Sequence, residues 1–402
     1  MLNTNFAPWP SFTEEEVDAV ADVLRSNKVN YWTGEECRAF ECEFAEWVGT
    51  KYAIALANGT VALDLALHGL RIGSANGGSA HDEVIVTPRT FLASVSCVVN
   101  AGAVPVFADV DRDSGNISAE TIEHVLSPRT RGAIIVHLAG WPADMDPIMA
   151  LAAKHGFKVI EDCAQAHGAR YKGLSVGAIG HVGAWSFCQD KIMTTGGEGG
   201  MVTTNDPDLW SRMWSYKDHG KSWEAVYERA HPPGFRWVHE SFGTNWRMLE
   251  MQATIGRIQL RRMHEWTAAR ARNTAVLRDA LTEFTGDEGI VYMPRPAGEG
   301  YVHAEYKAYA YVRAENLTDG WDRDRIVAEI VARGVPCYQG SCSEVYLEKA
   351  FDHVGWRPQE RLPVARSLGE TSLMWLVHPT LTPEQMQLAA DVSGEVLAMA
   401  SR

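Results

Sequence analysis

Apolar positions between residues 52 and 205 form short β-branched runs, separated by stretches with a spacing of three to four residues. The runs show little polar alternation, which is typical of strands that are covered on both faces. The stretches between them have the periodicity of helices packed on a sheet. This pattern predicts a repeating βα domain with a mostly parallel sheet between layers of helices. The predicted strands are YAIALA (52–57), EVIVTP (83–88), VPVFADV (104–110), GAIIVHL (132–138), FKVIED (157–162), AWSF (184–187) and GGMVTTN (199–205).

The pattern changes near residue 246. From there to about residue 284, apolar positions recur at helical spacing over roughly ten turns, which predicts one helix long enough to link two domains. The remaining chain alternates between strand-like and helical segments, as in a separate α+β unit. We therefore predict a large domain over 1–265 and a smaller one over 266–402. The segments of the smaller domain are the strand-like EYKAYAYVRAE (305–315), the helical DRDRIVAEIVARG (322–334) and the strand-like GVPCYQGS (334–341).

Composition and charge narrow the class of protein. The chain has 402 residues, of which 46% are hydrophobic and 22% charged, as in ordinary globular proteins. Its net charge of -14 argues against a nucleic-acid partner, because phosphate backbones require a concentrated basic surface. No apolar run of about 18 residues and no leader-like N-terminus is found, so no membrane span is expected. The seven cysteines are scattered, which predicts reduced thiols, no metal site and a cytoplasmic protein.

Candidate ligand-binding residues follow three predicted strands, at the sheet edge where ligands bind in open α/β folds. Asp162 ends one strand; its carboxylate either meets a cationic group of a ligand or caps a helix toward solvent. The sequence NGT (58–60) opens a helix whose first amides, with Thr60 and Val61, suit a phosphate or an ordinary cap. Phe91 follows a third strand and either stacks on a flat ring or fills the core.

Lys191 lies between a predicted strand and a glycine-rich loop in SFCQDKIMTTGGEGG (186–200). An ordinary surface lysine would fit this position, but a partly desolvated lysine at the ligand edge is an amine that can form a Schiff base. A phosphate site, a ring-stacking aromatic, a carboxylate and a reactive amine together are what pyridoxal 5'-phosphate (PLP) requires. The four signals therefore converge on PLP as the cofactor.

With these residues in view, the chain resembles the DegT/DnrJ/EryC1/StrS sugar aminotransferases from about residue 10 to residue 379. The resemblance implies a fold-type I PLP transferase, in which a mostly parallel seven-stranded sheet lies between helices and a smaller α+β domain follows. The motifs that carry it are NYWTG (30–34), ANGTVAL (57–63), DEVIVTPRTF (82–91), GAVPVFADVD (102–111), VHLAGWPADMD (136–146), VIEDCAQAHGA (159–169), SFCQDKIMTTGGEGG (186–200) and GTNWRMLEMQA (243–253).

The resemblance implies roles for individual residues around the reactive end of the cofactor. Lys191 stands where the family has the lysine that attaches PLP and then transfers protons. Asp162 matches the aspartate that pairs with the pyridine nitrogen, and Gln165 matches the glutamine near the phenolic oxygen. Phe91 falls where the family has a residue stacked on the ring.

The resemblance also implies how the phosphate is held. Ser186 matches a serine that hydrogen-bonds the phosphate, together with the amides of Thr60 and Val61. Asn245 matches an asparagine that reaches the phosphate from the neighbouring subunit, which implies a homodimer with shared active sites. The glycine-rich loop has one glycine more than the commonest motif of the family, so that its acidic residue, Glu198, comes one position later.

The implied reaction moves an amino group from L-glutamate to a keto-sugar. The expected substrate is a nucleotide-linked 3- or 4-keto hexose or deoxyhexose, and the product would enter a surface polysaccharide, a lipopolysaccharide or a natural product. An aminotransferase for a cyclitol or another carbocyclic ketone would have the same cofactor residues. A regulatory member of the family is the third alternative, and the presence of every cofactor residue argues against it. The family's dehydratases carry histidine at the lysine position, so Lys191 argues against that activity.

Overall fold

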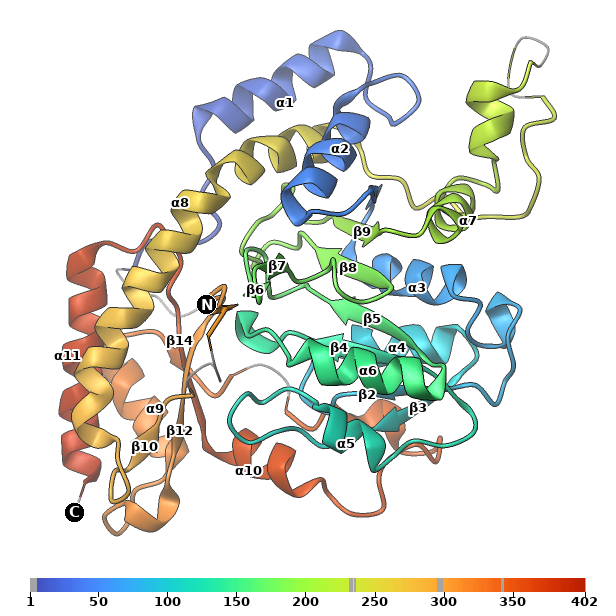
Figure 1. Cartoon of the computed structure of the whole chain (residues 1–402). Coiled ribbons are helices and arrows are strands. Elements are labelled where there is room, and N and C mark those ends of the chain that lie inside the picture. The colour runs from blue at the N-terminus through green and yellow to red at the C-terminus, as the bar shows by residue number, and fades with distance from the viewer. Residues whose placement is uncertain (1–5, 231–233, 235, 295–298, 341–342, 402) are drawn as a thin grey trace.

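A seven-stranded sheet lies at the centre of the N-terminal two thirds of the chain (Figure 1). The computed structural model describes residues 6–230, 234, 236–294, 299–340 and 343–401. Strand β9 runs antiparallel to both of its neighbours, whereas the other neighbouring strands are parallel, as predicted for a mostly parallel sheet. In sheet order the strands are β1 (Tyr52–Leu56), β9 (Gly200–Thr204), β8 (Val182–Ser186), β5 (Lys158–Asp162), β4 (Thr130–Val136), β2 (Glu83–Val86) and β3 (Val104–Phe107).

Alternate residues of the central strands enter two different hydrophobic cores, one on each face of the sheet. In β4, Ile134 and Val136 pack with helices α3 and α4, whereas Ala133 and Ile135 pack with α5 and α6. Successive side chains of a strand point to opposite faces, so a strand covered on both faces must be apolar throughout. This explains the uninterrupted apolar runs in the sequence. The helices are α3 (Gly59–Gly69), α4 (Ala93–Asn100), α5 (Ala119–Glu123) and α6 (Met145–His155).

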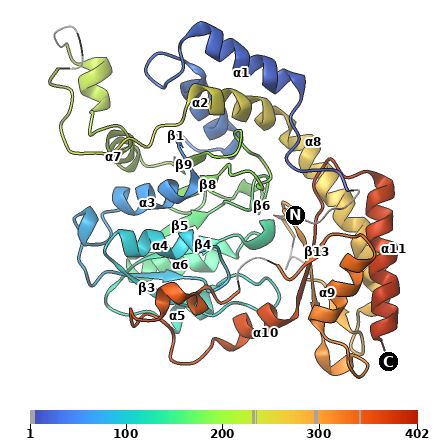
Figure 2. The ribbon, with the colours of Figure 1, turned by 180° about the vertical axis from the view of Figure 1, so that it is seen from behind.

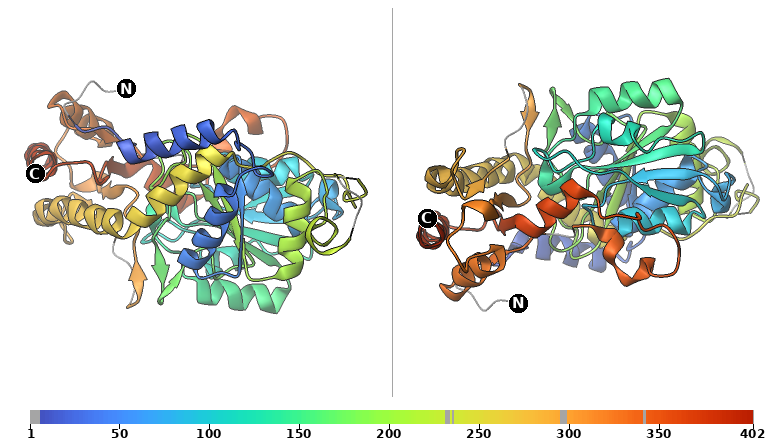
Figure 3. Two further views of the ribbon diagram at one scale, coloured as in Figure 1. Left: turned by 90° about the horizontal axis from the view of Figure 1, so that it is seen from above. Right: turned by 90° about the horizontal axis from the view of Figure 1, so that it is seen from below.

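One long helix, α8 (Glu250–Leu281), connects this part of the chain to the C-terminal part. It has 32 residues, begins four positions after the predicted start, and is followed by a 3-10 turn over Thr282–Phe284. Its first half packs against α1 (Glu14–Ser26) and α2 (Glu36–Val48), and its second half packs against α11 (Pro383–Ala400) (Figures 1 and 3). None of the helices in the described part of the chain combines the length and apolar character that crossing a bilayer requires. Helix α7 (Pro207–Lys217) follows β9 and packs on α3.

The C-terminal part contains an antiparallel sheet with α9 and α11 packed beside it (Figure 2). A small second sheet joins Arg170–Ser175 to Tyr301–Val302, and the segment around Tyr306 packs into the core on the α3 face of the central sheet. The predicted domain ranges therefore remain an expectation, because α8 and these contacts cross the proposed boundary. The remaining elements are β10 (Val291–Tyr292), β12 (Ala308–Val312), β14 (Ser372–Trp375), β13 (Cys337–Tyr338), β11 (Tyr301–Val302), β6 (Arg170–Tyr171), β7 (Leu174–Ser175), α9 (Arg323–Ala332) and α10 (Pro363–Thr371).

Candidate active site

A cavity of about 620 Å³ lies at the carboxyl edge of the central sheet, where β1, β2, β5 and β8 end. Most of the residues predicted from the sequence line it, although they come from four separate segments of the chain. Asn245 does not line it; this residue is exposed and pairs through its backbone with Asp218. The structure thus brings together Thr60, Val61, Phe91, Asp162, Gln165, Ser186 and Lys191.

The N-terminus of α3 lies in close contact with the end of β8. A Cβ atom on Gly59 would lie 2.5 Å from Ser186 Cβ, and one on Gly200 would overlap the carbonyl oxygen of Asn58. Only glycine permits these approaches, which bring the Ser186 hydroxyl next to the first turn of α3. The free amides of a helix N-terminus attract anions, so this end of the cavity suits a phosphate group.

The helix cap changes one detail of the predicted phosphate site. Asn58 Oδ1 accepts a hydrogen bond from the Val61 amide at 3.0 Å, so that amide already has a partner. The amides of Gly59 and Thr60 precede the first intrahelical hydrogen bond and remain available. The sequence ANGT did not distinguish these amides. The asparagine that favours the start of the helix also binds the third N–H of the helix, which is then not free for a phosphate.

Asp162 is the buried acid of the cavity, with 6% of its surface exposed. Its Oδ2 accepts from Ser94 Oγ at 2.7 Å and its Oδ1 accepts from the Ala164 amide at 3.1 Å. Both donors are neutral, and no cation among the described side chains forms an ion pair with this carboxylate. A protonated nitrogen in the cavity would supply the missing charge. Sequence reasoning missed Ser94, although it lies only three residues after Phe91.

Two further side chains present suitable surfaces to a flat ring. Phe91 is 64% exposed and lines the cavity, so its ring is free for stacking rather than buried in the core. The amide oxygen of Gln165 accepts from the Ala139 backbone at 2.8 Å. This contact fixes the side chain and leaves its NH2 group as the part that can serve a ligand.

Lys191 lies in a tight segment after β8, and its side chain is 16% exposed. The backbone is held on both sides, because the Lys191 amide donates to Cys188 O at 3.1 Å and Trp9 Nε1 donates to Lys191 O at 2.8 Å. Its Nζ lies 3.8 Å from Asp190 Oδ1. Neither Trp9 nor Asp190 was predicted, although Asp190 is the adjacent residue. Burial, followed by the charges of Lys191 and Arg270, lowers the pKa of the nearby His167 to about 3.

The additional glycine of the loop has a structural role. Gly196 and Gly197 both adopt positive φ angles, of 83° and 120°, which side chains other than glycine rarely allow. The turn is then fixed where Thr195 Oγ1 and Gln252 Nε2 donate to the carbonyl oxygen of Glu198, at 2.5 and 2.7 Å. Glu198 therefore reaches the wall of the cavity despite its later position in the sequence.

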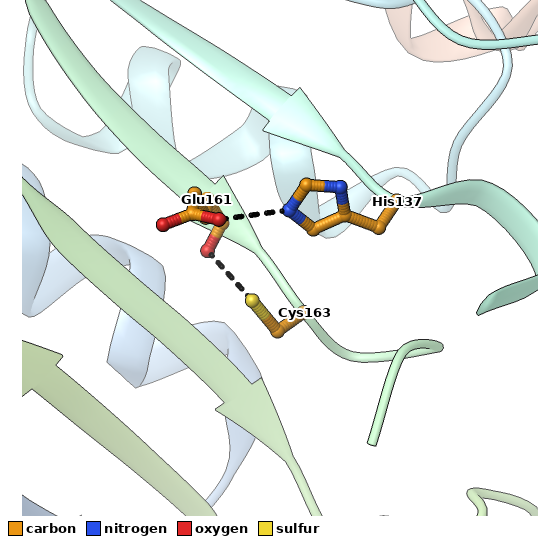
Figure 4. A group of neighbouring side chains, drawn as sticks. All are labelled: His137, Glu161 and Cys163. Carbon is orange, nitrogen blue, oxygen red and sulfur yellow. Dashed lines mark hydrogen bonds and ion pairs between the residues drawn. The ribbon is translucent and has the colours of Figure 1, made fainter. Parts of the chain in front are cut away.

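A buried cluster of His137, Glu161 and Cys163 lies at the carboxyl ends of β4 and β5 and has the residue types of a metal site (Figure 4). His137 Nδ1 accepts from the Ala143 amide, so Nε2 carries the proton and donates to Glu161 at 3.0 Å. The Cys163 thiol points to the backbone oxygen of Glu161. These contacts already use the atoms that would bind a cation, so we interpret the cluster as a hydrogen-bond network. The Glu161 carboxylate also accepts from the amides of Gly177, Ile179 and Gly180.

Strands of the central sheet deliver the ligand-binding residues to one sheet edge, which is the arrangement of an α/β ligand-binding fold. The solved structures that share this fold are fold-type I aminotransferases. The chain belongs to the DegT/DnrJ/EryC1/StrS aminotransferase family, whose sequence model matches residues 10–392. This is the family that the motifs predicted, and its aminotransferases depend on PLP.

Individual relatives match most of the chain. A UDP-N-acetyl-3-dehydro-α-D-glucosamine 3-aminotransferase of Acidithiobacillus ferrooxidans is 34% identical over 391 residues, which are 97% of this chain and 95% of that protein. An L-glutamine:2-deoxy-scyllo-inosose aminotransferase of Streptomyces fradiae is 36% identical over 348 residues, which are 82% of this chain and 78% of that protein. The crystal structure of an aminotransferase from Psychrobacter cryohalolentis superposes on this chain with a TM-score of 0.95 and 62% sequence identity. The superposition covers 98% of this chain and 99% of that chain.

Proposed function

We propose that this chain transfers an amino group from L-glutamate to a nucleotide-linked 3- or 4-keto hexose or deoxyhexose, with PLP as cofactor. The observation that carries the proposal is that Lys191 and Asp162 line the same cavity, where the buried Asp162 carboxylate has no cationic partner among the described residues. Membership of an aminotransferase family and the substrate in the name of the Acidithiobacillus relative support it.

The cavity residues fit PLP from one end to the other. Ser186 and the first amides of α3 would hold the phosphate, and Phe91 would cover the ring. Asp162 would receive the protonated pyridine nitrogen, and the NH2 group of Gln165 would donate to the phenolic oxygen. Bound PLP supplies an electron-withdrawing ring, which stabilises negative charge on the carbon beside the transferred nitrogen.

The residues of the chain position protons around this ring. Asp162 keeps a proton on the ring nitrogen, because its buried carboxylate is stabilised by a cation. The Nζ atom of Lys191 is the group that takes up and returns a proton within the cavity. The Asp190 carboxylate, whose Oδ1 lies 3.8 Å away, forms an ion pair with that amine. The exposed Asn245 would complete the phosphate site of a neighbouring copy in a homodimer.

The first test is spectroscopic. Protein purified with added PLP should show the absorbance band of lysine-bound cofactor, and borohydride should fix the cofactor to Lys191. The Lys191→Ala variant should not retain cofactor after reduction and should not transaminate. A wild-type protein without the band, or a Lys191→Ala variant that still turns over, would refute the assignment.

The second test identifies the substrate. A panel of UDP-, dTDP- and GDP-linked 3-keto and 4-keto sugars is incubated with L-glutamate, and 2-oxoglutarate is measured. We expect turnover with one nucleotide-linked keto-sugar and none with the corresponding sugar that lacks the nucleotide. Equal rates with and without the nucleotide would contradict the proposed substrate class.

A cyclitol ketone is the second candidate substrate, since the Streptomyces fradiae relative carries an inosose in its name. The same assay with 2-deoxy-scyllo-inosose, using L-glutamine and L-glutamate as alternative donors, separates the two. Turnover of the inosose above that of every nucleotide-linked sugar would favour the cyclitol reaction.

A further inference from the structure

Tyr306 of the C-terminal part of the chain reaches the segment that carries Lys191. Its side chain is 5% exposed, and its hydroxyl donates a hydrogen bond to Asp190 Oδ2. The other oxygen of the same carboxylate, Oδ1, lies 3.8 Å from Lys191 Nζ. Burial raises the pKa of Tyr306 well above its usual value, so the phenol stays protonated and acts as the donor.

The position of the Tyr306 hydroxyl is set by the large central part of the molecule. The Tyr306 amide donates to Ala139 O at 3.0 Å, and the Ala304 amide donates to Gly140 O at 2.9 Å. The Ala139 amide in turn donates to Gln165. The segment from 304 to 306 is therefore held against Ala139 and Gly140, which leaves the Tyr306 side chain little freedom to move.

Asp190 depends on this contact for its orientation. Its side chain is 60% exposed, and in the described structure it is held by contacts with the Tyr306 hydroxyl and the Lys191 ammonium. Burial by itself would raise the pKa of Asp190, but the charge of Lys191 and the hydrogen bond from Tyr306 bring it below its usual range. Lys307 also faces this group, with its Nζ 4.8 Å from the centre of the Tyr306 ring.

We propose that Tyr306 is a positioning residue for Lys191, because its phenol holds the Asp190 carboxylate within ion-pairing distance of the lysine amine. Without the hydroxyl, the exposed carboxylate turns toward water, and its attraction for the ammonium is screened. The inference rests on the proposed function of Lys191, and it assigns a role to a residue that lies 116 positions from Asp190 in the chain.

The test measures the reactivity of Lys191 in the full chain without cofactor. The protein is treated briefly with an amine-reactive ester at pH 7 and at pH 9.5, and modification of Lys191 is quantified by peptide mass spectrometry relative to the exposed Lys154. The ester reacts with the neutral amine, so loss of the carboxylate partner should increase labelling more at pH 7 than at pH 9.5. For Tyr306→Phe and Asp190→Asn we expect about three- to tenfold faster labelling at pH 7, the range that solvent screening leaves for a hydrogen bond to a charged group.

Tyr171→Phe is the matched control. Tyr171 is also buried and its hydroxyl also donates to an aspartate, at 2.6 Å, but this aspartate, Asp144, does not line the cavity, whereas Asp190 does. This variant should label Lys191 at the wild-type rate. The positioning role would be overturned if Tyr306→Phe labelled Lys191 at the wild-type rate, or if Tyr171→Phe increased labelling as much as Tyr306→Phe does. It would also be overturned by an increase of the same size at both pH values, because that result reports only easier access of the ester to Lys191.

Failure of this inference is distinguishable from failure of the proposed function. If the wild type binds PLP and transaminates while Tyr306→Phe labels like the wild type, only the role of Tyr306 fails. If the wild type neither binds PLP nor transaminates, the proposed function fails, whereas the labelling of Lys191 still reports its environment. In an active enzyme, Tyr306→Phe should lower kcat and leave KM for L-glutamate unchanged, because the phenol acts through Asp190.

Discussion

The contact between Gly59 and Ser186 is where the fold and the cofactor site are most directly linked. Replacing Gly59 by alanine would place a Cβ atom 2.5 Å from Ser186 Cβ, 2.9 Å from its Oγ and 3.0 Å from its Cα. Carbon atoms that are not bonded prefer separations of about 3.5–4.0 Å, so the two elements must move apart by roughly 1 Å. The shift would carry the first amides of α3 away from Ser186.

The cost of this shift has two parts. Overpacking of this kind destabilises a fold by about 1–3 kcal/mol, part of which is offset because alanine is a better helix residue than glycine by up to about 1 kcal/mol. Losing one hydrogen bond to a charged phosphate costs about 1.5–3 kcal/mol, which corresponds to roughly a ten- to hundredfold weaker Kd. We therefore expect Gly59→Ala to lower the unfolding midpoint slightly and the affinity for PLP strongly.

The assay is a titration of cofactor-free protein with PLP, followed by absorbance, next to a chemical denaturation curve. Gly394→Ala is the matched control, since Gly394 lies inside α11 and its added Cβ would meet only Phe284 Cε2 at 3.9 Å. This control should gain about 0.5–1 kcal/mol of stability and bind PLP as the wild type does. Wild-type affinity for PLP in Gly59→Ala would refute our interpretation of the helix terminus as the phosphate site.

Three further predictions concern single side chains. Asp162→Asn keeps the shape of the acid but removes its charge, so the rate of amino transfer from L-glutamate should fall by about tenfold to a hundredfold with PLP still bound, as single-turnover absorbance would show. Phe91→Ala should weaken PLP binding about two- to tenfold in the same titration and leave stability nearly unchanged, because the ring is exposed. Burial, followed by the charge of Arg270, lowers the pKa of Lys307 from 10.5 to about 8, so folding is penalised below pH 8 and the penalty disappears as the pH rises toward 10.5. Lys307→Met should therefore be more stable than the wild type at pH 7, by up to roughly 3 kcal/mol. Denaturation curves of the wild type should show a free energy of unfolding that rises between pH 8 and 10.5, and those of the variant should not. The same pH dependence in both proteins would contradict the lowered pKa of Lys307.

Much of the fold followed from the one-dimensional pattern. Strands such as β4 were predictable because a strand between two helix layers must be apolar at every position, and α8 because its apolar spacing continues without a break. The antiparallel direction of β9 was not predictable, since a buried strand reads the same in either direction. The proposed domain boundary depends on packing across α8 and was likewise beyond a sequence pattern.

The candidate site shows the same division. The sequence alone determined that Lys191, Asp162 and Phe91 follow strands of one sheet, and the geometry of parallel sheets then brings them to the same edge. Only the tertiary structure decided which amide of α3 is taken by Asn58, and which residue holds the Asp190 carboxylate. The physical reason is that strand periodicity acts over a few residues, whereas a hydrogen bond between residues more than a hundred positions apart depends on how the whole chain packs.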